Sequence, residues 1–281
     1  MRRDSVRVFC EPLGVSVDIA DHPQRIVCLA SSLTEALFEM GCGHRVVGIS
    51  VYCSRYIPAS DLPVVGDYLR VDESLLKQIT PDLILLTTGI QRALGLRLAQ
   101  AGYPVYALPL PSSMGGVMEN LNLLGGLVNE VESARRLRQR WEQQFRTICL
   151  SAPERRPRVY IELWFGRHLR TVGALSFIHD LVEAAGGDNI FGRDRRAYFV
   201  PDLEQVAEAR PDVLLFHTEP DYPVNVEALI EERGWHRWNP APYVVVGTVQ
   251  KGQNIIHEGP SMMETAMWLQ AHFHSWARHY G

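Results

Sequence analysis

The sequence predicts an α/β fold of two similar lobes, each a parallel sheet flanked by helices, joined by one long helix. Three observations predict it. Short apolar runs typical of buried strands alternate with helical patterns along the chain. The order of patterns in the first half recurs in the second half, as expected for two similar units. The 281 residues, 46% of them apolar, are enough for about two lobes.

The first lobe begins with a weak alternation over residues 5–20, which predicts a short hairpin. The run RIVCLA at 25–30 is a buried strand. Ser32 and Glu35 have the spacing of a capping box, which would open a helix that ends at Gly41. The same order of elements then predicts strands at 46–50, 81–86 and 104–110, and helices from Asp72 and at 91–101.

Residues 117–150 have helical periodicity throughout, with a break near Gly125-Gly126 or Asn129. PERRPR follows as a linker. The second half then predicts strands at 159–165, 211–216 and 243–248, and helices at 176–185, 202–209 and 260–278. We therefore expect an N-terminal lobe at 1–126, a bridging helix and linker at 127–156, and a C-terminal lobe at 157–281.

Two pairs of segments carry the internal repeat. LFEMGCGHRVVG at 37–48 aligns without gaps with LVEAAGGDNIFG at 181–192, sharing Leu, Glu and two Gly. The segment from Glu73 to PDLILL parallels the segment from Glu204 to PDVLLF, with one residue fewer between the Glu and the Pro. Repetition at this scale predicts two similar lobes with a ligand cleft between them.

Composition excludes several classes of protein. The 32 acidic and 28 basic residues are spread along the chain with a net charge of −4, so nucleic acid is not an expected partner. Five cysteines without a CxxC pair favour neither a disulfide framework nor structural zinc. The N-terminal MRRDSVRVFCEPLG lacks the apolar stretch of a signal peptide. As written, the chain is expected to stay in the cytoplasm unless a leader was removed or the start was misplaced.

Familiar catalytic motifs do not occur in the sequence. It contains no phosphate-binding GxxxxGK[ST], no GxSxG and no HExxH, and its glycines have the wrong spacing for a dinucleotide fingerprint. We therefore expect no catalytic residue, no cofactor and no metal site. Aromatic residues instead lie where the C-terminal ends of the expected strands meet their loops, which predicts a large, flat or bulky ligand held by stacking and burial of apolar area. They are Tyr52, Tyr56, Tyr68, Trp164, Phe165, Tyr198 and Phe199.

Five segments match a known family in order, from about residue 24 to 270. They are RIVCLASSLTEALFEMG, VVGIS, LPVVGDYLRVDESLLKQITPDLILL, SFIHDLVEAAGGDNIFG and DLEQVAEARPDVLLF. With them the chain resembles the substrate-binding proteins of ABC importers for cobalamin and ferric siderophores. The resemblance implies a bilobed monomer that is periplasmic or at the cell surface, with a long bridging helix at about 132–150.

The resemblance also implies roles for particular residues. Glu73 and Glu204 match the glutamates that meet arginines of the membrane permease. Hydrogen bonds to the ligand could come from the helix start at Ser31 and Ser32. Where cobalamin binders place a tryptophan before the docking helix, this chain has Asp67-Tyr68. The implied ligand-binding aromatics are Tyr52, Tyr68, either Trp164 or Phe165, and either Tyr198 or Phe199.

Three functions remain open at this stage. The leading one is a non-enzymatic binding protein that delivers cobalamin, or a related metal chelate, to an ABC importer. The second is a ferric-siderophore-binding protein. The third, of a different class, is a cytoplasmic enzyme or chaperone that handles a corrinoid or tetrapyrrole, with His257, Glu258 or Cys53 as axial ligand or acid. Because no metal-ligand cluster stands out, a metal that is already chelated is favoured over a bare ion.

Overall fold

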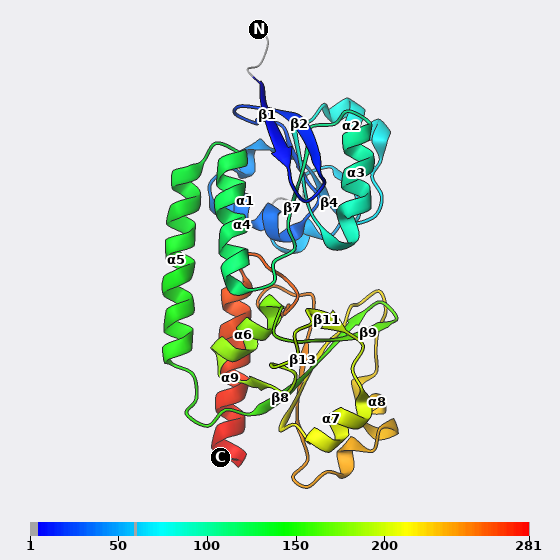
Figure 1. Ribbon diagram of the computed structural model, residues 1–281, viewed down its shortest axis with the longest axis vertical. Helices are drawn as coiled ribbons and strands as arrows, with labels where there is room; N and C mark the ends of the chain where they lie inside the picture. Colours follow the sequence, from blue (N-terminus) through cyan, green and yellow to red (C-terminus); the bar gives the residue numbers. More distant parts are fainter. Residues whose placement is uncertain (1–4, 59–60, 281) are drawn as a thin grey trace. The chain divides into compact units, whose positions relative to one another are not determined.

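The computed structural model describes residues 5–58 and 61–280, which form two compact units (Figure 1). The N-terminal unit comprises Met1–Pro111 and Val117–Trp141, and the C-terminal unit comprises Ser112–Gly116 and Glu142–Gly281. The chain passes between the units three times, once in the loop after Pro111 and twice inside helices, in α4 (Met114–Leu127) and in α5 (Val131–Leu150). The first four residues, part of the segment searched for a signal peptide, lie outside the described residues.

The N-terminal unit contains the expected parallel sheet, in the strand order β5-β4-β3-β6-β7. Figure 1 shows α1 and α4 on one side of this sheet and α2 and α3 on the other. An antiparallel hairpin of β1 and β2 precedes it, which confirms the expectation for residues 5–20. The elements are β1 (Ser5–Cys10), β2 (Val15–Ala20), β3 (Ile26–Cys28), α1 (Ser31–Glu39), β4 (Val46–Ser50), β5 (Val64–Gly66), α2 (Glu73–Ile79), β6 (Leu83–Thr87), α3 (Arg92–Gln100) and β7 (Val105–Leu108).

The long helical segment is interrupted at Asn129, one of the two places that the sequence indicated. Asn129 has a φ of 55°, a left-handed conformation that ends α4 before α5 begins. Gly125 lets the two helices approach closely, because a Cβ at this position would collide with Ala134. Ala134, Leu137 and Trp141 form the buried face of α5.

The C-terminal unit has a mixed sheet, in the order β11-β9-β8-β12-β13, with β10 also paired to β8. The expectation of a wholly parallel sheet is wrong here, because β9 runs antiparallel to β8. Only Gly166 and Arg167 separate these two strands, and so short a connection permits only an antiparallel pair. The elements are β8 (Arg158–Phe165), β9 (His168–Val172), α6 (Phe177–Ala185), β10 (Asp188–Asn189), β11 (Tyr198–Phe199), α7 (Leu203–Ala209), β12 (Val213–His217), α8 (Val226–Glu232), β13 (Tyr243–Gly247) and α9 (Met262–Tyr280).

Helices α2 and α7 show the internal repeat in atomic detail. Asp72 caps α2 by accepting from two backbone N–H groups, and Asp202 caps α7 in the same way. Both helices end on a left-handed residue, Thr80 in one and Arg210 in the other. Aligned on these caps, the two segments need no gap.

This register corrects the pairing of Glu73 with Glu204. The sequence alignment made them equivalent by omitting one residue. In the structure Glu73 is the first residue of α2, whereas Glu204 is the second residue of α7. The position that corresponds to Glu204 is therefore Ser74, and the two carboxylates leave their helices in different directions.

An aspartate carboxylate at the start of the strand after each helix fixes that strand in a similar way. The Asp82 carboxylate accepts from the backbone N–H groups of Gln24 and Arg25, at 2.8–3.1 Å. The Asp212 carboxylate likewise accepts from the N–H of Arg158 at 2.8 Å. The side chain of Arg25 also donates to the carbonyl of Ile79, the last residue of α2. In the same way, the side chain of Arg158 donates to the carbonyl of Ala209, the last residue of α7.

The expected capping box at the start of α1 is wrong. The N-cap is Ala30, whose side chain offers no acceptor, and Ser32 is already the second helical residue. Glu35 lies within the helix and is 1% exposed. Apolar packing of this buried helix takes the place of a polar cap. Among residues 5–58 and 61–280, no helix combines the length and the apolarity needed to cross a bilayer.

Candidate ligand-binding site

In the N-terminal unit two of the expected aromatic residues are in contact. Tyr52 follows β4 and Tyr68 follows β5, at the edge of the sheet where the parallel strands end. Their rings stack with centroids 4.2 Å apart and planes 20° from parallel. The guanidinium of Arg55 lies 5.4 Å from the Tyr52 ring centroid. Both tyrosines are half-buried, so the pair forms a fixed aromatic surface.

A tight turn holds Tyr68 in place. Asp67 accepts from the backbone N–H groups of Leu69 and Arg70 at 2.6 and 2.8 Å, and its own N–H donates to Arg70 O at 2.9 Å. Gly66 opens the turn, and a Cβ at this position would collide with Arg70 O. The turn therefore requires glycine, and the Asp67 carboxylate is used to fix the backbone.

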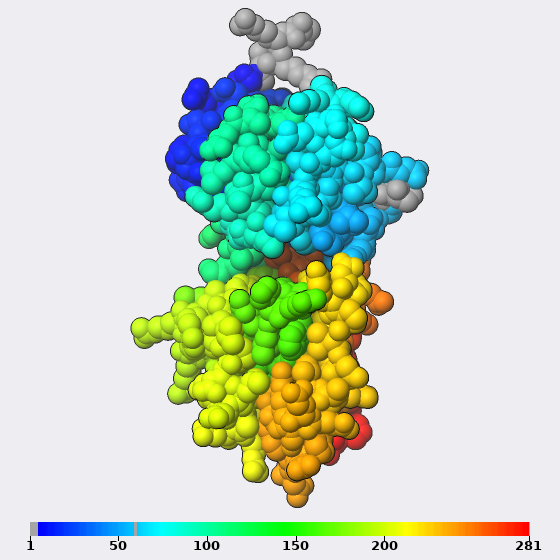
Figure 2. Space-filling view, turned by 90° about the vertical axis from the view of Figure 1, so that its right-hand side faces the viewer, coloured from blue at the N-terminus to red at the C-terminus, as the bar shows by residue number. Residues whose placement is uncertain are grey.

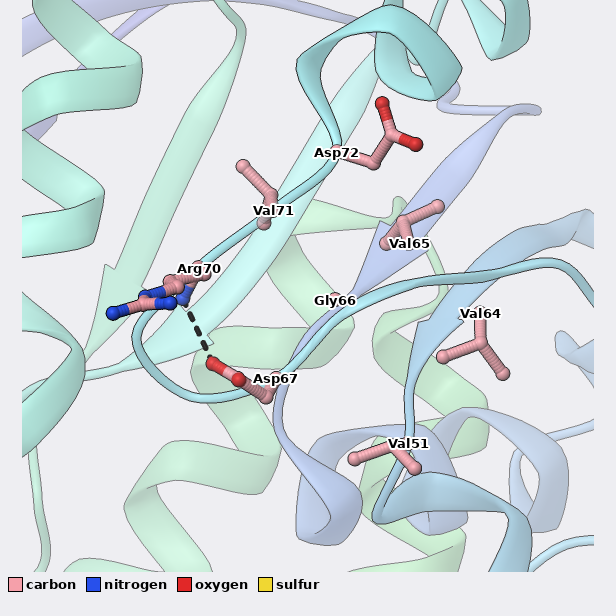
Figure 3. A pocket seen from close by; sticks show the side chains of 8 residues that line it. All are labelled: Val51, Val64, Val65, Gly66, Asp67, Arg70, Val71 and Asp72. Carbon is pink, nitrogen blue, oxygen red and sulfur yellow. Dashed lines mark hydrogen bonds between the residues drawn. The ribbon is translucent and has the colours of Figure 1, made fainter.

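The same turn borders a pocket of about 420 Å³ (Figure 3). Valine side chains form its apolar wall, and Asp67, Arg70 and Asp72 add charged groups at the turn and at the start of α2. This combination suits a ligand with both apolar surface and hydrogen-bonding groups. This pocket was not predicted from the sequence, although all of its lining residues except Val51 lie in the matched segment LPVVGDYLRVDES. The lining residues are Val51, Val64, Val65, Gly66, Asp67, Arg70, Val71 and Asp72.

The serines and the thiol singled out from the sequence are buried in the N-terminal unit. Ser31 and Ser32 lie in the first turn of α1 and are 9% and 4% exposed. Cys53 Sγ is 3.1 Å from the Ser50 hydroxyl and 3.2 Å from the Thr34 hydroxyl. Burial raises the pKa of this thiol. Cys53 is therefore a protonated core residue in this structure, which does not favour a role as axial ligand.

In the C-terminal unit Trp164 and Phe165 occupy the end of β8 and point to opposite faces of the sheet. Phe165 makes an edge contact with Tyr198 of β11, with ring centroids 6.2 Å apart. All three rings are half-buried. Burial raises the pKa of Tyr198 to about 12, so its hydroxyl is protonated at neutral pH.

Phe199 is a core residue. It is 8% exposed and packs in a cluster with Phe191 and Val206. The guanidinium of Arg196 lies 3.8 Å from its ring centroid. Of the two alternatives from the sequence, Tyr198 is therefore the residue with accessible ring surface.

A polar network beneath Trp164 was not expected from the sequence. The Glu162 carboxylate, which is fully buried, accepts from the indole Nε1–H of Trp164 at 2.8 Å. Its other oxygen accepts from the Tyr160 hydroxyl at 2.9 Å and from Arg233 at 2.6 Å. An acidic residue inside the apolar run VYIELWF was the signal that could have revealed it.

Tyr222 is a second residue that the sequence analysis missed. It is 50% exposed, and its ring atoms would lie 3.5 Å from a Cβ on Gly166, in the turn after β8. The Glu219 carboxylate accepts from the N–H of Gly166 at 3.1 Å.

His257, which the sequence offered as an axial ligand or acid of a cytoplasmic enzyme or chaperone, is 4% exposed. Among the described residues, no group of three or more His, Cys, Asp or Glu side chains is placed to hold a metal ion.

Solved structures share this fold. The periplasmic heme-binding protein RhuT from Roseiflexus sp. RS-1 matches with a TM-score of 0.76 and 22% identity, over 90% of this chain and 99% of that chain. The periplasmic vitamin B12 binding protein BtuF of Vibrio cholerae matches with a TM-score of 0.67 and 18% identity, over 91% and 98%. The chain therefore has the fold of these binding proteins.

The sequence comparisons identify the family. A model of the periplasmic binding protein family matches residues 26–241, and the chain belongs to this family. The cobalamin-binding protein of Halobacterium salinarum is 27% identical, over 93% of this chain and 72% of that protein. The vitamin B12-binding protein of Yersinia pestis is 25% identical over 70% of each chain. The resemblance to substrate-binding proteins of ABC importers is thereby confirmed.

Proposed function

We propose that this protein binds a cobalt corrinoid such as cobalamin, without converting it, and delivers it to an ABC permease. The observation that carries the proposal is the likeness over 93% of the chain to a protein named for cobalamin binding. The accessible ring surfaces at the strand ends of both units support it, because stacking on flat rings suits a large macrocyclic ligand.

Five aromatic side chains are the proposed ligand contacts. In the N-terminal unit they are the stacked pair Tyr52 and Tyr68, and in the C-terminal unit Trp164, Phe165 and Tyr198. Phe199, the other alternative from the sequence, packs in the core beside Phe191 and is not among these contacts. Polar contacts are proposed from the first turn of α1, at Ser31 and Ser32, where backbone N–H groups are directed out of the helix.

Glu73 and Glu204 are the proposed contacts to the permease. Both are exposed, and neither carboxylate has a hydrogen-bond or ion-pair partner among the described residues. The segments that carry them, α2–α3 (cyan) and α7–α8 (yellow to orange), lie at the surface of their units in Figure 2. Exposed carboxylates of this kind guide register and association rate more than they add affinity.

Equilibrium titration tests the ligand. The purified chain is titrated with cyanocobalamin, hemin and the ferric siderophore ferrichrome by calorimetry. We expect one-to-one binding of cyanocobalamin, with an absorbance spectrum that does not change with time after mixing. Binding of ferrichrome alone would assign the protein to iron uptake, and time-dependent conversion of the corrinoid would assign it to the enzyme class.

Substitutions test the contacts. Tyr68→Ala should weaken cyanocobalamin binding at least about fivefold, since stacked aromatic pairs contribute on the order of 1 kcal/mol beyond their buried area. Glu73→Ala with Glu204→Ala should leave binding intact and slow permease-dependent uptake, most clearly at low salt. Unchanged uptake with intact binding would exclude both glutamates as docking residues. Sedimentation of the wild type should report a monomer.

A further inference from the structure

The buried Glu162–Arg233 ion pair has no evident purpose as a stabilising feature of the C-terminal core. The Glu162 side chain is fully buried and the Arg233 side chain is 11% exposed. Taking both charges out of water costs several kcal/mol, and replacing such a pair by apolar residues is often neutral or stabilising. A buried pair of this kind therefore calls for a role other than stability.

The geometry of the pair indicates what that role is. Glu162 and Trp164 are two residues apart on β8, so their side chains share one face of the sheet. The carboxylate is held from below by Arg233, at the end of α8, and by Tyr160. Burial, with the nearby Glu162 carboxylate, raises the pKa of Tyr160, so its hydroxyl remains a donor. One oxygen, Oε1, accepts from the indole N–H of Trp164.

This hydrogen bond determines what Trp164 can offer a ligand. An indole has a single polar hydrogen, and here it is directed into the protein interior. The bond also selects one of the two orientations of the ring plane, so the ring is ordered before any ligand arrives. The half-buried ring therefore presents an apolar face and edge.

We infer that Glu162 is a positioning residue that fixes Trp164 for contact with a flat, apolar ring surface of the ligand by stacking alone. This inference rests on the proposed function and makes it more specific. A macrocycle with an extended ring face fits such a contact. A ligand that needs a hydrogen-bond donor at this position does not.

The test removes the network without leaving a buried charge. In the paired variant Glu162→Leu with Arg233→Met, both charges are replaced by apolar side chains, so the fold should be retained. We expect its affinity for cyanocobalamin to fall about tenfold. In the Trp164→Phe background, where no indole N–H exists, the same pair of substitutions should change affinity less than about twofold.

A matched control uses the Arg45–Glu130 ion pair of the N-terminal unit, whose side chains are 12% and 29% exposed. Arg45→Met with Glu130→Leu should leave cyanocobalamin affinity unchanged. The second readout is hydrogen exchange of the Trp164 indole N–H by NMR, assigned from the signal lost in Trp164→Phe. Exchange should be slow in the wild type and fast in the paired variant.

Two results would overturn the inference alone: wild-type affinity in the paired variant, or an equal loss of affinity in both backgrounds. The first would mean that ring orientation is immaterial, and the second that the pair acts through the fold. A wild type that binds none of cyanocobalamin, hemin and ferrichrome would overturn the proposed function and with it the ligand-directed role of Glu162. Slow indole exchange would then still report the hydrogen bond itself.

Discussion

The two units share a framework but differ in how they hold their aromatic side chains. Each has an aspartate-capped short helix followed by a strand that a second aspartate fixes. In the N-terminal unit Tyr52 and Tyr68 order each other by stacking above a glycine turn. In the C-terminal unit a buried carboxylate orders Trp164. The two units thus share the bonds that build the scaffold and differ in the residues at the strand ends.

The ends of β6 and β12 show the same divergence at a single position. In the gapless register Thr87 corresponds to His217. The N–H and hydroxyl of Thr87 donate to Gln91 Oε1 at 3.1 and 3.2 Å. His217 is fully buried, and neither ring nitrogen has a hydrogen-bond partner in the described chain. The polar groups at this position therefore have a hydrogen-bond partner in the N-terminal unit, whereas the ring nitrogens in the C-terminal unit have none among the described residues.

The largest predicted effect comes from His217. Burial lowers its pKa from 6.5 to about 4, so between these values the unfolded chain binds more protons than the folded chain. The burial of neutral His217 therefore does not reduce the free energy of unfolding above about pH 6.5. As the pH falls from 6.5 toward 4, this free energy declines by about 3 kcal/mol in total. Urea unfolding of the wild type and of His217→Leu over this pH range measures it. An equally steep decline in the variant would show that another group is responsible.

The aspartates that fix the strands should give the next largest effect. Asp82→Ala removes bonds to two backbone N–H groups, and Asp212→Ala removes a bond to one. At about 1 kcal/mol for each bond, we expect losses of about 2 and about 1 kcal/mol in the free energy of unfolding. Denaturant midpoints measure both, with Asp188→Ala at an exposed position as the control. A larger loss at Asp212 would contradict the shared framework as described.

The helix caps should give the smallest effect. Asp72→Ala and Asp202→Ala each remove the acceptor for two N–H groups, so similar and modest losses of thermal stability are expected. The Ser74 hydroxyl, which donates to Asp72, lowers the pKa of that carboxyl. The contribution of the Asp72 cap is therefore present at neutral pH and lost as the pH falls below its usual range near 4. A melting temperature of Asp72→Ala equal to the wild type at pH 7 would contradict it.

Much of this fold could be predicted from the sequence, because apolar runs, and the glycine, proline and polar residues that separate them, indicate directly which segments are buried. The strand around Ile26, the helix after Asp72 and the break at Asn129 were all indicated in this way. The polar strand β9 was missed, because its pairing depends on the tight turn at Gly166 and not on an apolar pattern. The register of Glu73 and Glu204 was misread, because the helix caps, not the glutamates, are the equivalent residues.

The candidate site was only partly predictable. Position at or just beyond the end of a strand identified Tyr52, Tyr68 and Trp164 as candidates, but could not distinguish Tyr198 from the core residue Phe199. Nor could it find the contact between Glu162 and Arg233, which joins residues far apart in sequence. Such contacts depend on tertiary packing, for which a single sequence carries little local signal.

Hydrogen exchange with and without cyanocobalamin tests the central claim most directly. If the protein binds a corrinoid through the strand-end aromatics, saturating cyanocobalamin should slow backbone exchange at Gly66–Arg70 in the N-terminal unit and at Trp164–Gly166 in the C-terminal unit. Exchange in β1 and β2, away from these strand ends, should be unchanged. Protection confined to other segments, or no change at any cyanocobalamin concentration, would contradict the account.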